Sequence, residues 1–204
     1  MIKLNLETNG YLHIKENIFN INKNILNEFN LIHNKYPSAW ENVSVINKNE
    51  LINNYNEINK IYKKILNIID FNVIKDKVKF DDVWFINSKK SFYKENELPN
   101  IPHIDKIRKF KIMIYLNEIS KESGPLYIVN CNTKKYENFR LGLKKNYKEN
   151  QDNAIQDIPL NQFSPMVGDF GSTIFFDTNT PHFAGPFLDN SHFRNVIRFN
   201  FRYI

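Results

Sequence analysis

Two histidines and an aspartate have the side-chain types and the spacing of a metal site. His103 and Asp105 are two residues apart, in the stretch Ile101-Pro102-His103-Ile104-Asp105. Residues i and i+2 of an extended strand point to the same face, so both side chains could reach one ion. His182, which follows Thr180 and Pro181, supplies a second imidazole far downstream. Mixed nitrogen and oxygen ligands suit Fe(II), Mn or Zn, and three protein ligands leave coordination positions open, which indicates a catalytic ion.

Apolar spacing predicts two helices ahead of the His–Asp pair. Apolar residues recur at helical spacing from Ile18 to Ile32, and Pro37 breaks the pattern. A second helix is predicted from about Lys48 to Ile69, with a wide apolar stripe and with Asn and Lys facing water. We expect both helices to pack on the outside of the sheet that follows. A short strand, Tyr11–Ile14, precedes them.

From about residue 72 the apolar period changes to two, which predicts strands. The clearest is Lys109–Leu116, and the polar stretch 133–153 predicts a loop with a short helix near Tyr136–Leu143. The other candidates are Val73–Lys75, Val83–Asn87, Leu126–Val129, Thr173–Phe176 and Asn195–Tyr203. Two helices followed by many strands indicate an α+β domain whose β part is a sandwich or jelly roll. The chain has no βαβ rhythm and no G-x-G-x-x-G, which argues against a nucleotide-binding Rossmann unit.

Length and composition fit one globular domain over residues 1–204. The 204 residues are 25% charged, 42% hydrophobic and 14% aromatic, enough to build a large β-rich core. No run reaches the roughly 18 apolar residues of a transmembrane helix, so we expect no membrane association. Cys131 is the single cysteine, which excludes an intramolecular disulfide and suits a reducing compartment. We therefore expect a cytoplasmic protein, whose oligomeric state is not readable from the sequence.

The net charge of +6 leaves two interpretations open. It favours an anionic partner, such as nucleic acid, a phosphorylated ligand or a CoA thioester. It is also what A/T-rich codons produce, because Asn, Ile and Lys are all over-used and the Lys residues are scattered. The second interpretation has more support, so a nucleic-acid partner is not expected.

Four parts of the chain together carry a resemblance to a known family. They are Asn9–Leu12 before a helix, His103–Asp105, Ile114–Leu126 with its Ser123-Gly124-Pro125 turn, and the block from Gly168 through His182 to Arg194. They resemble the phytanoyl-CoA dioxygenase-like branch of the Fe(II)- and 2-oxoglutarate-dependent oxygenases, over nearly the whole chain. One loop departs from the family: Asn130–Thr133 stands where Pro-Gly-Ser-His is common. That loop lies near the substrate entrance in such folds, so the substrate class does not carry over.

The resemblance implies a double-stranded β-helix (a jelly roll) with N-terminal helices packed on the sheet. His103, Asp105 and His182 would bind Fe(II) at its mouth. 2-Oxoglutarate would be the co-substrate and O2 the oxidant, with succinate and CO2 as products beside a hydroxylated small molecule. Related halogenases place a halide where this chain has Asp105, so we expect a hydroxylase.

The distal carboxylate of 2-oxoglutarate needs a fixed cation, and the fork of an arginine pairs bidentately with a carboxylate. We expect Arg194 in this role, because its place after His182 and before an apolar strand fits the family's arginine. Arg198 is the alternative, since a strand over this segment points both arginines to the same face.

Two other functions stay open. Arg198-Phe199-Asn200-Phe201-Arg202 invites comparison with AlkB-like oxygenases of nucleic acid or protein, although the spacing matches their paired arginines poorly. A non-catalytic jelly-roll binding protein is the third reading, and the intact His–Asp–His set argues against it.

Overall fold

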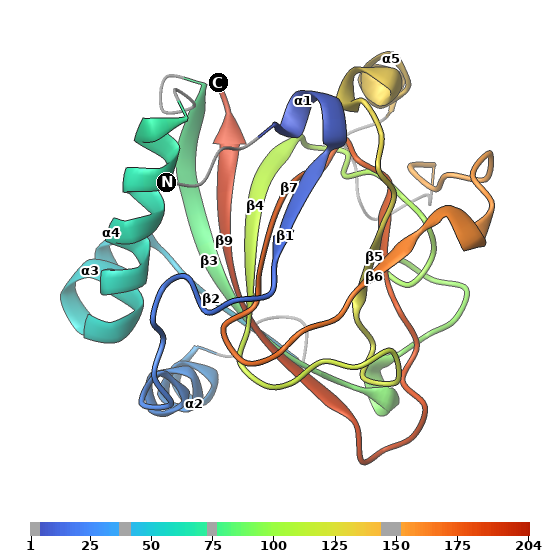
Figure 1. Cartoon of the computed structure of the whole chain (residues 1–204). Coiled ribbons are helices and arrows are strands. Elements are labelled where there is room, and N and C mark those ends of the chain that lie inside the picture. The colour runs from blue at the N-terminus through green and yellow to red at the C-terminus, as the bar shows by residue number, and fades with distance from the viewer. Residues whose placement is uncertain (1–4, 37–41, 73–76, 144–151) are drawn as a thin grey trace.

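Two antiparallel β-sheets face each other in the computed structural model, which describes residues 5–36, 42–72, 77–143 and 152–204 (Figure 1). The major sheet has the strand order β1-β7-β4-β9-β3-β2 and the minor sheet the order β6-β5-β8. This is the expected jelly roll. The strands are β1 (Tyr11–Ile14), β2 (Val43–Ile46), β3 (Val78–Lys89), β4 (Lys109–Tyr115), β5 (Leu126–Ile128), β6 (Ser164–Met166), β7 (Thr173–Asp177), β8 (His182–Ala184) and β9 (Phe193–Tyr203).

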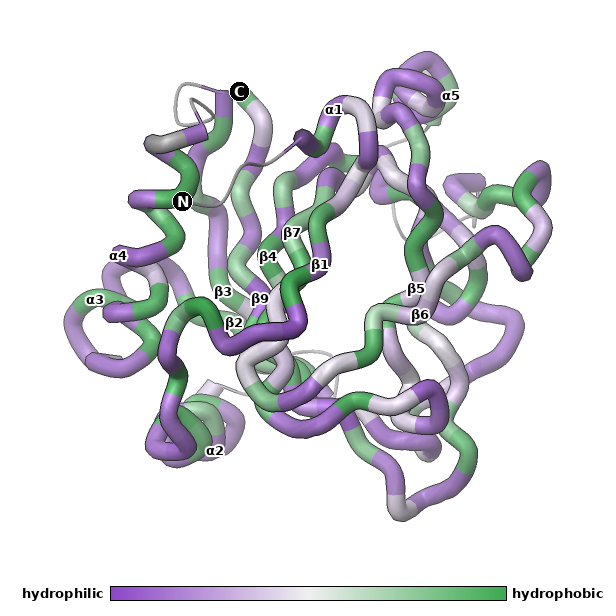
Figure 2. Tube along the Cα trace, viewed as in Figure 1, coloured by the Kyte–Doolittle hydropathy of each residue, from purple (hydrophilic) through white to green (hydrophobic). Residues whose placement is uncertain are grey.

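Helices cover the outer face of the major sheet, as expected. Phe29 of α2, Ile58 and Ile65 of α4 and Phe199 of β9 belong to one buried apolar cluster between the helices and the sheet. Figure 2 shows hydrophobic and hydrophilic residues interleaved along α4, the pattern of a helix with one buried face. None of the helices in the described part of the chain is long and apolar enough to cross a membrane. The helices are α1 (Leu6–Asn9), α2 (Ile25–Lys35), α3 (Lys48–Asn54), α4 (Asn56–Phe71) and α5 (Glu137–Gly142).

Strand β9 divides its side chains between the two faces of the major sheet. It lies between β4 and β3, so every other residue points away from the helices. Ile197 and Phe199 join the helix-side core, whereas Val196 joins a second apolar cluster between the two sheets. Arg194 and Arg198 have the same parity as Val196, which directs both guanidinium groups to the space between the sheets.

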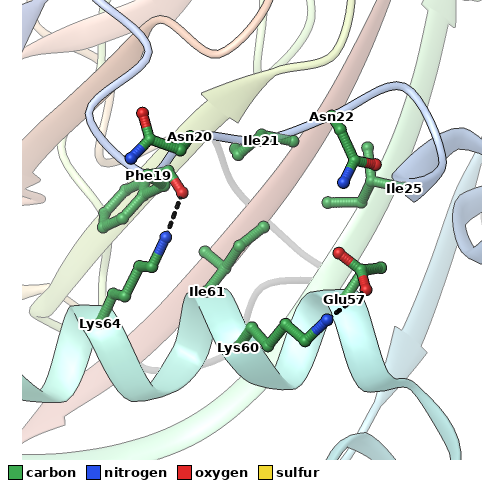
Figure 3. A pocket seen from close by; sticks show the side chains of 9 residues that line it. All are labelled: Phe19, Asn20, Ile21, Asn22, Ile25, Glu57, Lys60, Ile61 and Lys64. Atoms are coloured by element: carbon green, nitrogen blue, oxygen red, sulfur yellow. Dashed lines mark hydrogen bonds and ion pairs between the residues drawn. The ribbon is translucent and has the colours of Figure 1, made fainter.

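The first long helix begins later than its apolar spacing predicts. Helix α2 starts at Ile25, because the Asn17 side chain binds both backbone groups of Ile21 at 2.8 and 2.9 Å and Asn20 has a φ of 50°. Phe19 and Ile21 are still buried, since this segment lies along α4, where the Lys64 ammonium donates to the carbonyl of Phe19 (Figure 3). The cleft between them has a volume of about 50 Å³, room for little more than water.

The second predicted helix is two helices. The backbone is extended at Tyr55, with φ at −132°, so α3 ends at Asn54 and α4 begins at Asn56. The Glu28 carboxylate accepts hydrogen bonds from the backbone N–H groups of Glu57 and Ile58, at 3.0 and 3.1 Å. The acceptor for these unpaired N–H groups at the start of α4 therefore comes from α2, about 30 residues away in the sequence.

Most of the predicted strands are present with shifted ends. β3 and β9 extend beyond the predicted segments, and Val73–Lys75 lies outside the described residues. The short helix near Tyr136 is confirmed as a 3-10 turn, Thr133–Tyr136, followed by α5. Two further 3-10 turns are Lys90–Phe92 and Leu160–Gln162.

Candidate metal centre

Backbone pairing places His103 beside His182. The N–H of each histidine donates to the carbonyl of the other, at 3.0 and 2.9 Å, and Asp105 N–H donates to the carbonyl of Thr178 at 3.0 Å. The strand expected around His103 is limited to these isolated pairings, whereas His182 begins strand β8. The local backbone is still extended enough for the His103 and Asp105 side chains to converge.

The three side chains form one compact donor set. One ligand atom from each of His103, Asp105 and His182 lies within 4.8 Å of the others. Asp105 Oδ1 is 3.9 Å from His103 Nε2 and 3.7 Å from His182 Nε2. The imidazole centroids are 4.6 Å apart, and both histidines are buried. Two nitrogens and one carboxylate oxygen on one side of an ion would leave its other side open.

Backbone carbonyls determine which ring nitrogen of each histidine is free. His103 Nδ1 is 2.8 Å from the carbonyl of Ile101, and His182 Nδ1 is 2.8 Å from the carbonyl of Thr180. A carbonyl can only accept, so each Nδ1 carries the proton and each Nε2 keeps a lone pair. Metal-binding histidines are held in this way by a partner on the other ring nitrogen.

Charge favours a carboxylate and two neutral imidazoles. Burial alone would raise the pKa of Asp105, but the Lys111 ammonium and the two histidines hold it well below its ordinary value. Lys111 Nζ lies 2.6 Å from Asp105 Oδ2, the oxygen that faces away from the imidazoles. Burial lowers the pKa of His103, and burial together with the His103 ring lowers the pKa of His182 to about 3. All three groups are therefore in the protonation state that binds a cation.

The donor set opens into a cavity of about 570 Å³ between the two sheets. This volume lies within the range of small-molecule sites, about 300–1,000 Å³. The apolar part of the wall includes Val43, Ile86, Met113, Leu126, Phe176 and Phe187, and the charged part includes Lys89, Lys94, Glu97, Lys111, Arg194 and Arg198.

Arg194 and Arg198 both line the cavity, as the alternation of β9 predicts. Arg194 is 7% exposed and donates through Nη1 to the carbonyl of Gly124, while its Nε is buried without a hydrogen-bond partner. Arg198 lies over the Trp84 ring, 4.2 Å from its centroid, and its Nε is also buried without a partner. Neither guanidinium forms an ion pair with a carboxylate of the described residues.

Two residues have a larger part in the site than sequence reasoning assigned. Lys111 contacts the Asp105 carboxylate, a pairing that the strand pattern does not reveal because the two residues lie on different elements. Trp84 packs against the apolar cluster between the two sheets and also lines the cavity. The parity of its strand contains that signal, since Trp84 alternates with the helix-side residues Val83 and Phe85.

The loop Asn130–Thr133, His192 and Arg202 are not among the described residues that line the cavity. In that loop Thr133 is buried, and its hydroxyl donates to the carbonyl of Glu7. His192 pairs with Asp189 at 2.9 Å on an exposed loop. Arg202, the second arginine of the AlkB-like comparison, is exposed and binds Asp81.

Several solved structures of oxygenases have folds similar to that of this chain. EvdO2 from Micromonospora carbonacea var. aurantiaca, complexed with 2-oxoglutarate, has a TM-score of 0.60 and 15% identity over 98% of this chain and 88% of that chain. SnoK, a non-heme alpha-ketoglutarate-dependent carbocyclase from nogalamycin biosynthesis, has a TM-score of 0.56 and 12% identity, with coverages of 97% and 81%.

HygX from Streptomyces hygroscopicus, with nickel, 2-oxoglutarate and hygromycin B bound, has a TM-score of 0.56 and 10% identity over 97% of this chain and 84% of that chain. No family model and no curated protein sequence matches the chain. At these identities the likeness extends to the fold, and the jelly roll with helices on its major sheet is the fold that this chain shares with those oxygenases.

Proposed function

We propose that this protein is an Fe(II)- and 2-oxoglutarate-dependent oxygenase that hydroxylates a small molecule. The observation that carries the proposal is the convergence of His103 Nε2, His182 Nε2 and Asp105 Oδ1 in the wall of a cavity that Arg194 and Arg198 also line. The sequence pattern resembles the phytanoyl-CoA dioxygenase-like branch, and the solved structures of similar fold include proteins bound to 2-oxoglutarate.

The donor set fits a divalent iron. His103 and His182 present lone pairs because their Nδ1 protons are engaged by carbonyls, and Asp105 presents its charged oxygen between them. Lys111 holds the other oxygen of Asp105, which supports one-oxygen ligation. When bound, Fe(II) with 2-oxoglutarate supplies the activation of O2 and the oxidative decarboxylation that yields succinate and CO2.

Arg194 is the residue we assign to the distal carboxylate of 2-oxoglutarate. It is buried, it is anchored by the carbonyl of Gly124, and its unpartnered Nε leaves one side of its fork free for an anion. A cation that is already desolvated and fixed binds a carboxylate strongly, because little ordering remains to be done on binding.

The apolar wall suits the hydroxylation of a small molecule. Met113 and Phe176 border the cavity near the donor set and would exclude water from the reacting carbon. Asp105 occupies the ligand position where related halogenases place a halide, which favours hydroxylation over halogenation.

Anaerobic titration tests the proposal. Adding Fe(II) and 2-oxoglutarate to the metal-free protein should produce the visible charge-transfer band of the chelate, only when both are present. His182→Ala should abolish the band, and His192→Ala, which removes an imidazole outside the donor set, should leave it unchanged. A folded wild-type protein without the band would refute iron and co-substrate binding together.

Arg194→Gln should lower the affinity for 2-oxoglutarate about tenfold or more, because it removes a charge-assisted hydrogen-bonded pair. A screen of small metabolites scored by succinate release then tests turnover. If the protein binds Fe(II) and 2-oxoglutarate but no metabolite raises succinate production above the rate without substrate, the result would favour the binding-protein alternative.

A further inference from the structure

We propose that Arg198 and Trp84 form a second anion-binding subsite, and that the substrate is a small organic acid whose carboxylate binds there. This inference rests on the proposed function, in which Arg194 holds the co-substrate. It adds the chemical class of the substrate and the residues that recognise it.

Arg198 is built like a binding group rather than a structural one. Its guanidinium carbon lies over the Trp84 ring, 4.2 Å from the centroid, a cation–π contact that holds the group in place through its face rather than through its N–H donors. Its Nε is buried and has no hydrogen-bond partner among the described residues. Asp105 and Asp82 are close enough to favour the charged form of Arg198, but Asp105 binds Lys111 and Asp82 accepts from Asn200.

The charge of the cavity requires another anion. Among its described lining residues, five are Lys or Arg and two are Asp or Glu. Lys111 is neutralised by Asp105, and Lys94 pairs with Glu97 at 3.2 Å near the surface. A divalent metal and the dianionic 2-oxoglutarate add no net charge. The lining therefore keeps its excess of positive charge, and because Arg194 already contacts 2-oxoglutarate, Arg198 is the inner lining cation with no anion in contact among the described residues; Lys89 is exposed.

An anion is needed there because a desolvated guanidinium is costly. Burial lowers the pKa of Arg198 to about 10, the direction expected when water no longer solvates the charge fully. A bound carboxylate would restore that solvation with two parallel hydrogen bonds. The planar fork, already held by Trp84, matches a planar carboxylate best.

The position of the subsite also limits the shape of the substrate. Arg198 is the register partner of Met113 on β4 and of Trp84 on β3, so its side chain lies among apolar wall residues. Arg198 interacts electrostatically with both Asp105 and Lys111, so it lies close to the donor set. We therefore expect a compact acid with an apolar body, oxidised at a carbon only a few bonds from the carboxyl group.

Calorimetric binding to the Ni(II)- and 2-oxoglutarate-loaded protein tests the subsite without turnover. The probes are hexanoate and phenylacetate, each compared with its primary amide, which has the same shape and no charge. Wild-type protein should bind the acids about tenfold or more tightly than the amides, as a charge-assisted pair predicts. Arg198→Gln should remove this preference without weakening 2-oxoglutarate.

The controls separate recognition from folding. Arg202→Gln changes an exposed arginine of the same strand and should leave the acid preference intact. Arg198→Lys retains the charge and loses the fork, so it should give an intermediate preference if Arg198→Gln does not fold. Trp84→Phe keeps a ring under the guanidinium and should reduce the preference only partly.

Three results would overturn the inference. They are equal binding of acids and amides by the wild type, an acid preference that survives Arg198→Gln, and a loss of 2-oxoglutarate binding in Arg198→Gln while Arg194→Gln retains it. The last result would assign the co-substrate to Arg198. Failure of the wild type to bind 2-oxoglutarate with Ni(II) would instead refute the proposed function itself.

Discussion

The two carboxylate oxygens of Asp105 have different partners. Oδ1 faces both imidazoles, whereas Oδ2 accepts from the Lys111 ammonium at 2.6 Å. The side chain is thus oriented by a neighbour that would not itself contact the metal. Such partners fix the geometry of a ligand and the oxygen that it presents.

Asp105→Ala should abolish retention of iron, because it removes the only anionic ligand of the set. It also leaves Lys111 buried without its carboxylate, so the variant should be less stable than the wild type. Metal content by mass spectrometry and urea unfolding measure the two effects. The double variant Asp105→Ala/Lys111→Met should recover part of the stability and none of the iron.

Asp189→Ala, which removes an exposed aspartate, is the matched control and should retain iron like the wild type. Iron retention by Asp105→Ala at the wild-type level would show that the carboxylate is not a ligand.

Cys131 should react slowly with thiol reagents in the native state. Burial raises the pKa of its thiol to about 11, so at neutral pH the reactive thiolate is scarcer than in a free cysteine. Iodoacetamide labelling followed by mass spectrometry should be slow in buffer and fast in urea. Equal rates in both conditions would contradict the burial of this side chain.

At the scale of elements, α4 depends on a residue of another helix. Its first backbone N–H groups donate to the Glu28 carboxylate of α2, while Tyr55 interrupts the chain before it. Helix α2 is consequently joined to the N-terminus of α4 by charged hydrogen bonds, which replace a local cap on α4. The apolar stripe from Lys48 to Ile69 is therefore divided between α3 and α4, with the extended backbone of Tyr55 between them.

Glu28→Ala should destabilise the protein by about 0.5–2 kcal/mol, the range measured for lost helix caps. The urea midpoint reports the change. Glu95→Ala, at an exposed position outside the helices, should have little effect. Equal stability of the two variants would mean that water replaces the Glu28 carboxylate without cost.

At the scale of the whole molecule, two buried and two half-buried histidines make stability depend on pH. Burial lowers the pKa of His13, His33, His103 and His182 below the ordinary value of 6.5. The unfolded chain then binds more protons than the native state below about pH 6.5, so stability should fall as pH decreases. For His182 this loss continues down to about pH 3.

The metal-free protein should therefore have a lower urea midpoint at about pH 5.5 than at about pH 7.5. Below about pH 6.5 the free energy of unfolding should fall by up to about 1.4 kcal/mol per pH unit for each fully buried imidazole. His13→Gln, which removes one contributor outside the donor set, should make the dependence shallower. Stability that is constant or higher at the acidic pH would contradict the burial of these neutral rings.

The sequence by itself determined the type and order of the metal-binding candidates. It also indicated the long helical segments and most of the long strands, and that Arg194 and Arg198 share a face, but not the short strands β2, β6 and β8. These properties follow from side-chain chemistry and from backbone periods of 3.6 and 2.0, which act over a few neighbouring residues. These properties can therefore be predicted from the sequence without knowledge of long-range contacts.

Only the tertiary structure decided which side chains meet. The pairing of Lys111 with Asp105, the Trp84 ring beneath Arg198 and the Glu28 cap of α4 each join residues of different elements. Such contacts are set by how sheets and helices pack around the core, and no local period encodes them. The same packing brings the His–Asp pair of residues 103 and 105 beside His182.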